Sequence, residues 1–262
     1  MSVILRKYLL ISLAMFQATF ICAGKDSPGE FYQITVYHYN NAVQEQTIEI
    51  YLQNALLPAL HKMGTINIGV FKSLSNDTSA DKLLYVFMPV KSLEQLAQLP
   101  AKLAADKAFQ TTGATYIEAA YTSPPYTRKE TILLHAFPLA PQMKKPKLKS
   151  PLNERVYELR SYESPTEKIF QNKVQMFNAG GEIDFFKKLN FNAVFYSSVI
   201  AGSKMPNLMY MTTFENMADR EAHWKSFVED PFWKTLSSMP EYQNNVSRND
   251  ITFLRPVSYS DF

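Results

Sequence analysis

Cysteine is nearly absent from this chain: Cys22 is the only one among 262 residues, and it lies in the apolar N-terminal segment. If that segment is removed, the remaining protein has no thiol, which excludes cysteine nucleophiles, thiolate metal sites and disulfides. The fold must then be stabilised by its core alone. A composition of 46% hydrophobic and 13% aromatic residues is ample for such a core and argues against disorder.

An excess of charge of either sign is also absent. The chain has 27 basic and 24 acidic residues, and removal of Arg6 and Lys7 with the N-terminal segment leaves 25 against 24. Such an even balance gives no reason to expect a nucleic acid or an anionic membrane as a partner. No metal site is predicted either, because no metal-ligand spacing relates the four histidines, which are His38, His61, His135 and His223.

Residues 1–24 have the pattern of a signal peptide. Arg6 and Lys7 precede a mostly apolar run, and the small residues Ala23 and Gly24 follow it. Cleavage after Gly24 predicts export to the periplasm or the extracellular space, with no integral membrane span in the mature protein. The alternatives are a retained membrane anchor and a lipid on Cys22, although Phe20 and Ile21 are bulky for a lipoprotein signal.

The chain contains an internal repeat. Residues 31–37 (FYQITVY) resemble residues 156–162 (VYELRSY), and further anchor residues keep nearly the same offset. Tyr157, Tyr196 and Tyr210 each follow their counterparts by 125 residues, the counterparts being Tyr32, Phe71 and Tyr85. A constant offset across several elements indicates one supersecondary unit used twice, each copy needing the other to bury its apolar surface.

Each copy has the order βαββαβ. In the second copy, strands are predicted at 156–162, 192–200, 208–214 and 251–254, and helices follow Ser164, resume after Gly180-Gly181 and span 216–228. The fold class is therefore α+β: two tandem ferredoxin-like βαββαβ plaits packed sheet to sheet as an α/β barrel. We assign 25–138 to the first domain, 139–153 to a solvated linker rich in proline and lysine, and 154–262 to the second domain.

Three helix starts can be predicted from capping residues. Ser164 is expected to cap the first helix of the second copy, with Pro165 in the first turn and Glu167 completing a capping box. Asp230 before Pro231 is expected to be an N-cap, as is its counterpart Asp106. The aromatic residues near Asp230 are expected to form a core patch rather than a ligand cage; they are Trp224, Phe227, Phe232 and Trp233.

Three segments of the second copy resemble the NIPSNAP family: 154–167 (ERVYELRSYESPTE), 205–211 (MPNLMYM) and 224–233 (WKSFVEDPFW). The resemblance implies membership of the dimeric α/β-barrel superfamily, with the two copies fused in an exported bacterial protein. That superfamily includes haem-degrading and quinone-forming monooxygenases, chlorite-decomposing haem enzymes and lactone isomerases. The NIPSNAP branch has no agreed catalytic residues, so the resemblance implies a fold rather than an activity.

Six residues are candidates for a ligand site inside the barrel. Alternation along the strand places Glu158, Arg160 and Tyr162 on one face and the apolar Tyr157 and Leu159 on the other. Because the apolar face should meet the helices, we expect the polar trio to point into the barrel. Its counterparts in the first copy are Gln33, Thr35 and Tyr37. A structural ion pair joining the sheets is the ordinary interpretation of Glu158 and Arg160; ligand binding or proton transfer is the alternative.

The predicted function is accordingly broad. We expect an exported NIPSNAP-type barrel protein of undefined activity that binds a small molecule or a protein partner, and further homo-oligomerisation is left open. The alternative is a monooxygenase, either cofactor-independent or haem-using. No cofactor is predicted; haem would require one of the four histidines as an axial ligand.

Overall fold

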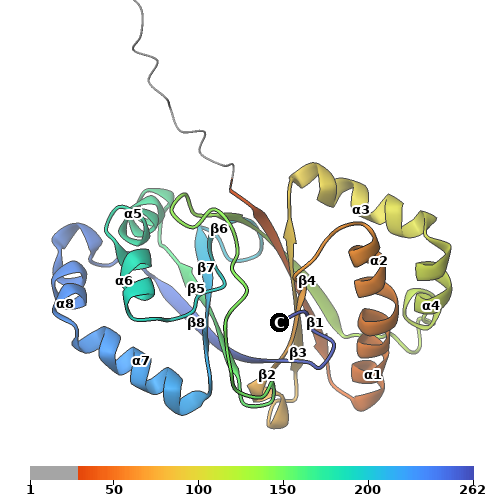
Figure 1. Ribbon diagram of the computed structural model, residues 1–262. Helices are drawn as coiled ribbons and strands as arrows, with labels where there is room; N and C mark the ends of the chain where they lie inside the picture. Colours follow the sequence, from red (N-terminus) through yellow and green to blue (C-terminus); the bar gives the residue numbers. More distant parts are fainter. Residues whose placement is uncertain (1–28) are drawn as a thin grey trace, which may run out of the picture.

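The protein forms a closed eight-stranded barrel flanked by two layers of helices (Figure 1). This arrangement comes from a computed structural model, which describes residues 29–262. The predicted signal peptide at 1–24 and its Cys22 lie outside the described residues. The strand order around the barrel is β1-β3-β2-β8-β5-β7-β6-β4.

The first repeat supplies four strands and a continuous helical layer. Its first helix contains a π-helical turn and its last two helices meet at Asp106. The elements are β1 (Phe31–Tyr39), α1 (Ala42–Tyr51), a π-helical turn (Leu52–Leu56), α2 (Leu57–Lys62), β2 (Gly69–Ser73), a 3-10 turn (Leu74–Asp77), β3 (Lys82–Val90), α3 (Leu93–Ala105), α4 (Lys107–Ile117) and β4 (Arg128–Ala136).

The second repeat has the same order of strands and helices. Gly181, with a φ of +87°, separates its first two helices in the left-handed conformation that glycine adopts without strain. The elements are β5 (Val156–Glu163), α5 (Glu167–Phe177), α6 (Glu182–Lys188), β6 (Phe195–Ala201), β7 (Asn207–Phe214), α7 (Met217–Glu229), α8 (Pro231–Ser238), a 3-10 turn (Pro240–Tyr242) and β8 (Arg248–Pro256).

Capping explains where several helices begin. Asp230 accepts a hydrogen bond from the backbone N–H of Phe232, and Asp106 accepts from Ala108 and Phe109, as predicted. The prediction for Ser164 was wrong. Thr166 caps α5 instead, because the Ser164 hydroxyl is buried and donates to the carbonyl of Asn245.

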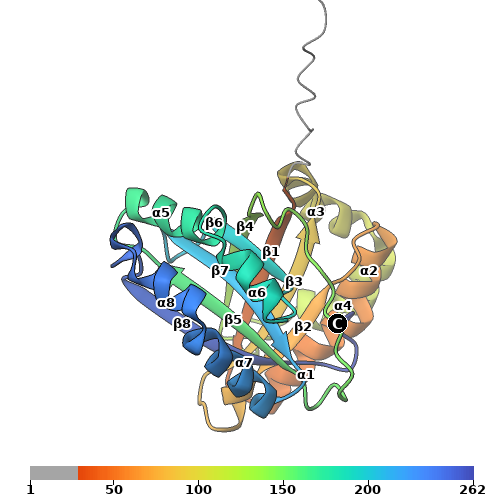
Figure 2. The same ribbon diagram turned by 60° about the vertical axis from the view of Figure 1, so that its left-hand side comes forward.

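Two four-stranded antiparallel sheets make up the barrel. The first has the order β4-β1-β3-β2 and the second β8-β5-β7-β6. They join edge to edge where β2 pairs with β8 and β4 pairs with β6. Helices α1–α4 cover the outer face of the first sheet and α5–α8 that of the second (Figures 1 and 2). The predicted α+β fold, with two ferredoxin-like plaits forming a barrel, is confirmed.

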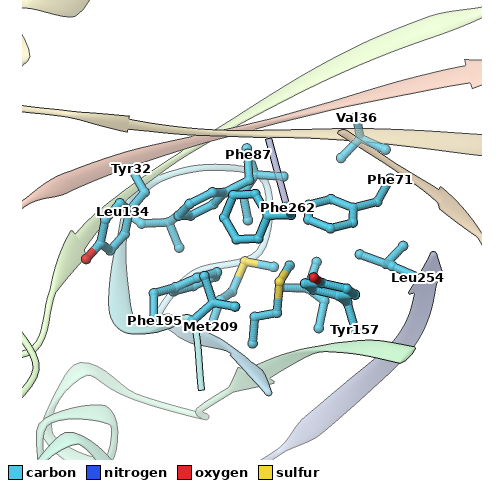
Figure 3. Packing of buried hydrophobic residues seen from close by; sticks show 14 of the residues in the cluster. Tyr32, Val36, Phe71, Phe87, Leu134, Tyr157, Phe195, Met209, Leu254 and Phe262 are labelled. Atoms are coloured by element: carbon cyan, nitrogen blue, oxygen red, sulfur yellow. The ribbon is translucent and has the colours of Figure 1, made fainter. Parts of the chain in front are cut away.

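The centre of the barrel is a packed aromatic core. Phe262 inserts between the sheets, with ring centroids 5.6 Å from Phe71, 6.1 Å from Phe87 and 6.1 Å from Tyr157 (Figure 3). Phe87 stacks on Phe195 at 5.0 Å. Strand residues from both repeats meet in this cluster, so neither sheet buries its inner face alone.

The linker is held against the second repeat and runs along the barrel between the two helical layers (Figure 1). The backbone N–H of Lys144 donates to the carbonyl of Val194 at 2.8 Å, and Met143 and Leu148 pack against the barrel core. This segment is therefore an ordered part of the fold as well as a connector.

Candidate functional sites

The six predicted site residues do not line the barrel interior. Tyr157 and Leu159 belong to the interior core, whereas Glu158 and Arg160 point outward to the helical layer of the second repeat, where they meet Arg220 and Trp224. The predicted orientation of the strand was wrong. The reason is that both faces of β5 are covered: the closed barrel receives the apolar side chains, and α7 supplies hydrogen-bond partners for the polar ones.

Glu158 is the centre of a buried charge cluster under α7. Its carboxylate accepts hydrogen bonds from Arg160 Nε at 2.5 Å, Arg220 Nε at 2.8 Å and Trp224 Nε1 at 2.8 Å. The side chain of Glu158 is 0% exposed, so this charge has no contact with water. The Arg160 guanidinium also lies 3.7 Å from the centroid of the Trp224 ring, a cation–π contact. The buried carboxylate and the buried guanidinium therefore both have polar or aromatic partners.

The cluster favours the ionised form of Glu158. Burial alone would raise the pKa of this carboxyl, but the hydrogen bonds and positive charges of Arg220 and Arg160 outweigh burial and hold the pKa below its usual value of 4.5. Tyr162 extends the network, since Arg160 Nη1 donates to its hydroxyl at 2.7 Å and that hydroxyl lies 3.0 Å from the hydroxyl of Tyr210. The arrangement resembles a structural ion network and not an open ligand site.

A second buried pair joins α5 to α6. Lys173 Nζ donates to Glu182 Oε2 at 3.1 Å, and both residues are buried. Burial raises the pKa of Glu182, and the charge of Lys173 only partly opposes this. Sequence analysis missed this pair. Lys173 falls three residues after Phe170, on the helix face that packs against the sheet, and a charged residue on an apolar face was the signal.

Acidification is expected to change the contributions of Glu158 and Glu182 to the free energy of unfolding in opposite directions. The folded-state pKa of Glu158 is lowered, so the stability it contributes is full above its usual pKa of 4.5 and is lost as pH falls through the folded value. The folded-state pKa of Glu182 is raised, so its contribution grows as pH falls toward 4.5. Urea unfolding of the wild type, Glu158→Gln and Glu182→Gln across a pH series measures both slopes. If the difference in the free energy of unfolding between the wild type and Glu158→Gln does not change with pH, the lowered pKa of Glu158 is contradicted.

The first repeat has no charges at the corresponding positions. Gln33 Nε2 donates to Thr35 Oγ1 at 3.0 Å, and Tyr37 packs edge-on against Tyr116 and Tyr126 under the helices. Burial raises the pKa of Tyr37 to about 12, so the phenol stays protonated. The two trios therefore form separate groups on opposite sides of the barrel and do not converge on one site.

A cavity of about 340 Å³ opens at one end of the barrel. It lies where β1, β5 and β6 end and where β3, β4, β7 and β8 begin. We call it the barrel-end cavity. Its inner wall is apolar, and its lining includes Val36, Leu83, Ile132, Leu159, Val199 and Met209.

Polar side chains surround the mouth of this cavity. His38 Nδ1 lies 2.9 Å from Asp81 Oδ2, and its Nε2 lies 3.5 Å from Glu130 Oε1. Lys204 pairs with Asp250, and hydrogen bonding from Lys204 lowers the pKa of that carboxyl. Burial raises the pKa of Tyr85 to about 12, so its phenol can donate a hydrogen bond into the cavity. The mouth combines both signs of charge with neutral donors.

Three of the four histidines already have polar partners at their ring nitrogens. His38 is the one histidine that lines the barrel-end cavity, and both of its ring nitrogens face carboxylate oxygens where an axial ligand needs one directed at iron. His61, in the last turn of α2, pairs with Asp261, and His223 on α7 bonds to the carbonyl of Asp219. Among residues 29–262, no group of three or more histidine, cysteine or acidic side chains is placed to hold a metal ion.

The aromatic residues of α7 and α8 behave largely as predicted. Trp224, Phe227 and Trp233 pack in the core between the second sheet and its helices. Phe232 is the exception, because it remains 39% exposed. In the part of the chain that the structure describes, no helix has the length and apolar character needed to span a membrane.

Comparison with known proteins identifies the second repeat. The NIPSNAP family model matches residues 157–261. The second repeat is a NIPSNAP domain. The matched region contains Glu158, Arg220 and Trp224, so the buried charge cluster belongs to the NIPSNAP domain, whereas the first repeat lies outside the match. No curated protein matches the chain.

Solved structures share the arrangement of the whole chain. A "putative monooxygenase" from Lactobacillus acidophilus NCFM is similar with a TM-score of 0.57 and 13% identity, over 87% of this chain and 94% of that one. Another from Fusobacterium nucleatum has a TM-score of 0.58 and 7% identity, over 87% and 93%. An anthrone oxidase-like protein has a TM-score of 0.51 and 8% identity, over 88% and 93%. At these identities the likeness shows the fold alone, which is a pair of ferredoxin-like plaits. In this chain the second plait is the NIPSNAP domain.

Proposed function

We propose that the protein binds a small, mainly apolar ligand with one polar end in the barrel-end cavity. The observation that carries this proposal is the cavity itself, whose apolar wall leads to a mouth with hydrogen-bonding groups. A volume of about 340 Å³ falls in the range of small-molecule sites, which are mostly apolar with a few placed polar groups. Tyr85 is suited to bind the polar end, and Val36 and Val199 to contact the apolar part.

Filling the cavity is expected to abolish this binding. Leu83→Trp replaces an alkyl side chain at the cavity wall by a larger indole ring. Because Leu83 is only partly buried, the indole can occupy the open space of the cavity. The neutral probe N-phenylnaphthylamine, followed by its fluorescence, is expected to bind the wild type and to lose at least about tenfold in affinity with Leu83→Trp, a loss of roughly 1.4 kcal/mol. Leu93→Trp, at an exposed position on α3, is the matched control. Equal binding by the wild type and Leu83→Trp would contradict the proposal.

A second candidate is cofactor-independent oxygenation in the same cavity. The cavity has an apolar wall that would shield a substrate from water, and the phenol of Tyr85 could hold a substrate oxygen. Anthrone is a suitable probe, because its oxidation by O₂ gives anthraquinone and water without a further reductant. Oxygen uptake that depends on anthrone, and that Leu83→Trp removes, would support an enzyme. Probe binding without oxygen uptake would favour the binding function.

We also propose that the protein is exported, to the periplasm or beyond the cell. The pattern of residues 1–24 supports this, with Arg6 and Lys7 before an apolar run. In a bacterial host, the protein isolated from the exported fraction is expected to begin at Lys25. Intact-mass measurement of that protein is the test. A cell-associated product that retains residues 1–24 would contradict cleavage after Gly24.

A further inference from the structure

We propose that a groove beside the inter-repeat linker binds an amphipathic carboxylate, such as a long-chain fatty acid. This linker groove lies between residues 139–147 of the linker and residues 186–196, which include the end of α6, the start of β6 and the loop between them. It has a volume of about 580 Å³. It shares no lining residue with the barrel-end cavity, which opens elsewhere on the barrel. The two sites can therefore be tested independently.

The floor of the linker groove is apolar. Phe186, Val194 and Phe195 line it and are themselves almost fully buried, which fixes their positions. Ala140 on the linker and Ala193 before β6 are small, and their size leaves the volume open. Such a floor favours an alkyl chain, because each methylene removed from water contributes to binding.

The rim of the groove is positive and contains no acidic residue. Four lysines line it: Lys144, Lys145, Lys147 and Lys187. Lys187 pairs with Asp184 at 2.7 Å, while the other three form no ion pair within residues 29–262. Outside residues 1–24 the chain has 25 basic and 24 acidic residues. The concentration of positive charge at the groove is therefore a local feature. Charge complementarity therefore selects an anion.

Hydrogen bonds from the linker backbone hold the wall of the groove in place. The backbone N–H of Lys144 donates to the carbonyl of Val194 at 2.8 Å, and that of Lys147 donates to Asn192 Oδ1 at 3.3 Å. The linker wall is thus fixed by main-chain hydrogen bonds, while the lysine side chains stay exposed and free to reach a carboxylate. A preformed wall reduces the ordering cost of binding.

An amphipathic carboxylate uses both features of the groove. A small anion such as phosphate would contact the lysines and leave the apolar floor empty, and a neutral alcohol would fill the floor and leave the lysines unmatched. A long-chain carboxylate places its chain along Leu139, Ala140 and Ala193, above the buried rings of the floor, and its charge beside Lys144 and Lys145. Dodecanoate, below its micelle concentration, is a simple probe of this class.

Calorimetric titration of the full chain with dodecanoate tests the proposal. The wild type is expected to bind, and Lys144→Gln/Lys145→Gln/Lys147→Gln is expected to weaken binding by roughly tenfold, the scale for removing several exposed charge contacts together. Lys149→Gln is the matched control, since Lys149 is exposed on the same linker and does not line the groove. Ala193→Phe should also weaken binding by filling the floor, and Leu83→Trp should leave it unchanged.

Several results would overturn this site. Equal affinity of the triple glutamine variant and the wild type for dodecanoate would show that the three lysines do not bind the carboxylate. Loss of dodecanoate binding in Leu83→Trp would transfer it to the barrel-end cavity. Equal binding of dodecyltrimethylammonium would show that charge is not selected, and binding of a glutamate-rich peptide in preference to dodecanoate would assign the groove to a protein partner.

Discussion

Replacing Glu158 by glutamine is expected to lower the free energy of unfolding by about 3–5 kcal/mol, the scale for removing one partner of a buried ion pair. Glutamine keeps the volume but removes the negative charge that Arg160 and Arg220 share. Arg160 is almost as deeply buried as Glu158 and lies on the Trp224 ring, so it cannot easily turn to water. Urea unfolding followed by tryptophan fluorescence measures the change, since Trp224 belongs to the cluster.

The same substitution elsewhere on β5 provides the control. Glu163 lies at the end of this strand, 25% exposed, with Arg248 at 4.0 Å. Glu163→Gln should change the free energy of unfolding by about 0–1 kcal/mol, as exposed pairs do. The double variant Glu158→Gln/Arg160→Met should recover much of the loss, because neither buried charge remains and Arg220 is partly exposed. A cost for Glu158→Gln as small as that of Glu163→Gln would contradict a buried cluster.

Separating the repeats is expected to abolish the monomeric fold. A fragment of residues 151–262 retains its helices but loses the partners of both edge strands, because β8 pairs with β2 and β6 pairs with β4. Its inner face would also expose large side chains that the barrel buries, including Tyr157, Phe195, Met211 and Leu254. Unpaired edges next to an apolar face favour self-association.

Sedimentation velocity measures this outcome. The fragment 151–262 should sediment as a dimer or larger species, and co-expression with residues 25–150 should restore a soluble complex of one copy each. A 151–262 fragment that remains a cooperatively folded monomer would mean that the sheet face does not need to be covered. Fusion of the repeats therefore supplies within one chain the surface that a second subunit would otherwise provide.

The repeat allowed the fold to be predicted, and Tyr157 occupies the barrel-interior position that Tyr32 has in the first repeat. The other two anchor pairs are not equivalent in the structure, because Phe71 and Tyr85 pack in the barrel interior whereas Tyr196 and Tyr210 pack under the helices. The orientation of β5 could not be predicted in the same way. Alternation separates Tyr157 from Glu158, but it does not say which face meets the helices when both faces are buried. The partners that decide it, Arg220 and Trp224, lie more than sixty residues later on α7.

The start of α5 shows the same limit at shorter range. Ser164 and Thr166 are both good capping residues, and a tertiary contact between Ser164 and Asn245 selects Thr166. The barrel-end cavity could not be predicted from the sequence for a related reason, because its wall combines residues from seven strands, such as Val36, Ile132 and Val199. Local sequence patterns predict the helices and strands. Long-range packing decides which face of each one is turned to the core and where cavities remain between them.

The pairing of β2 with β8 also bears on how fast the protein folds. Phe71 lies opposite Pro256 in this pairing, which brings together segments separated by most of the chain. Contacts so distant in sequence require a large loop to close before any of them forms, and proteins rich in such contacts fold slowly. Each four-stranded sheet can assemble from nearer segments, with β1 pairing with β3 and β5 with β7. Barrel closure at the β2–β8 seam is therefore the step that we expect to limit the folding rate.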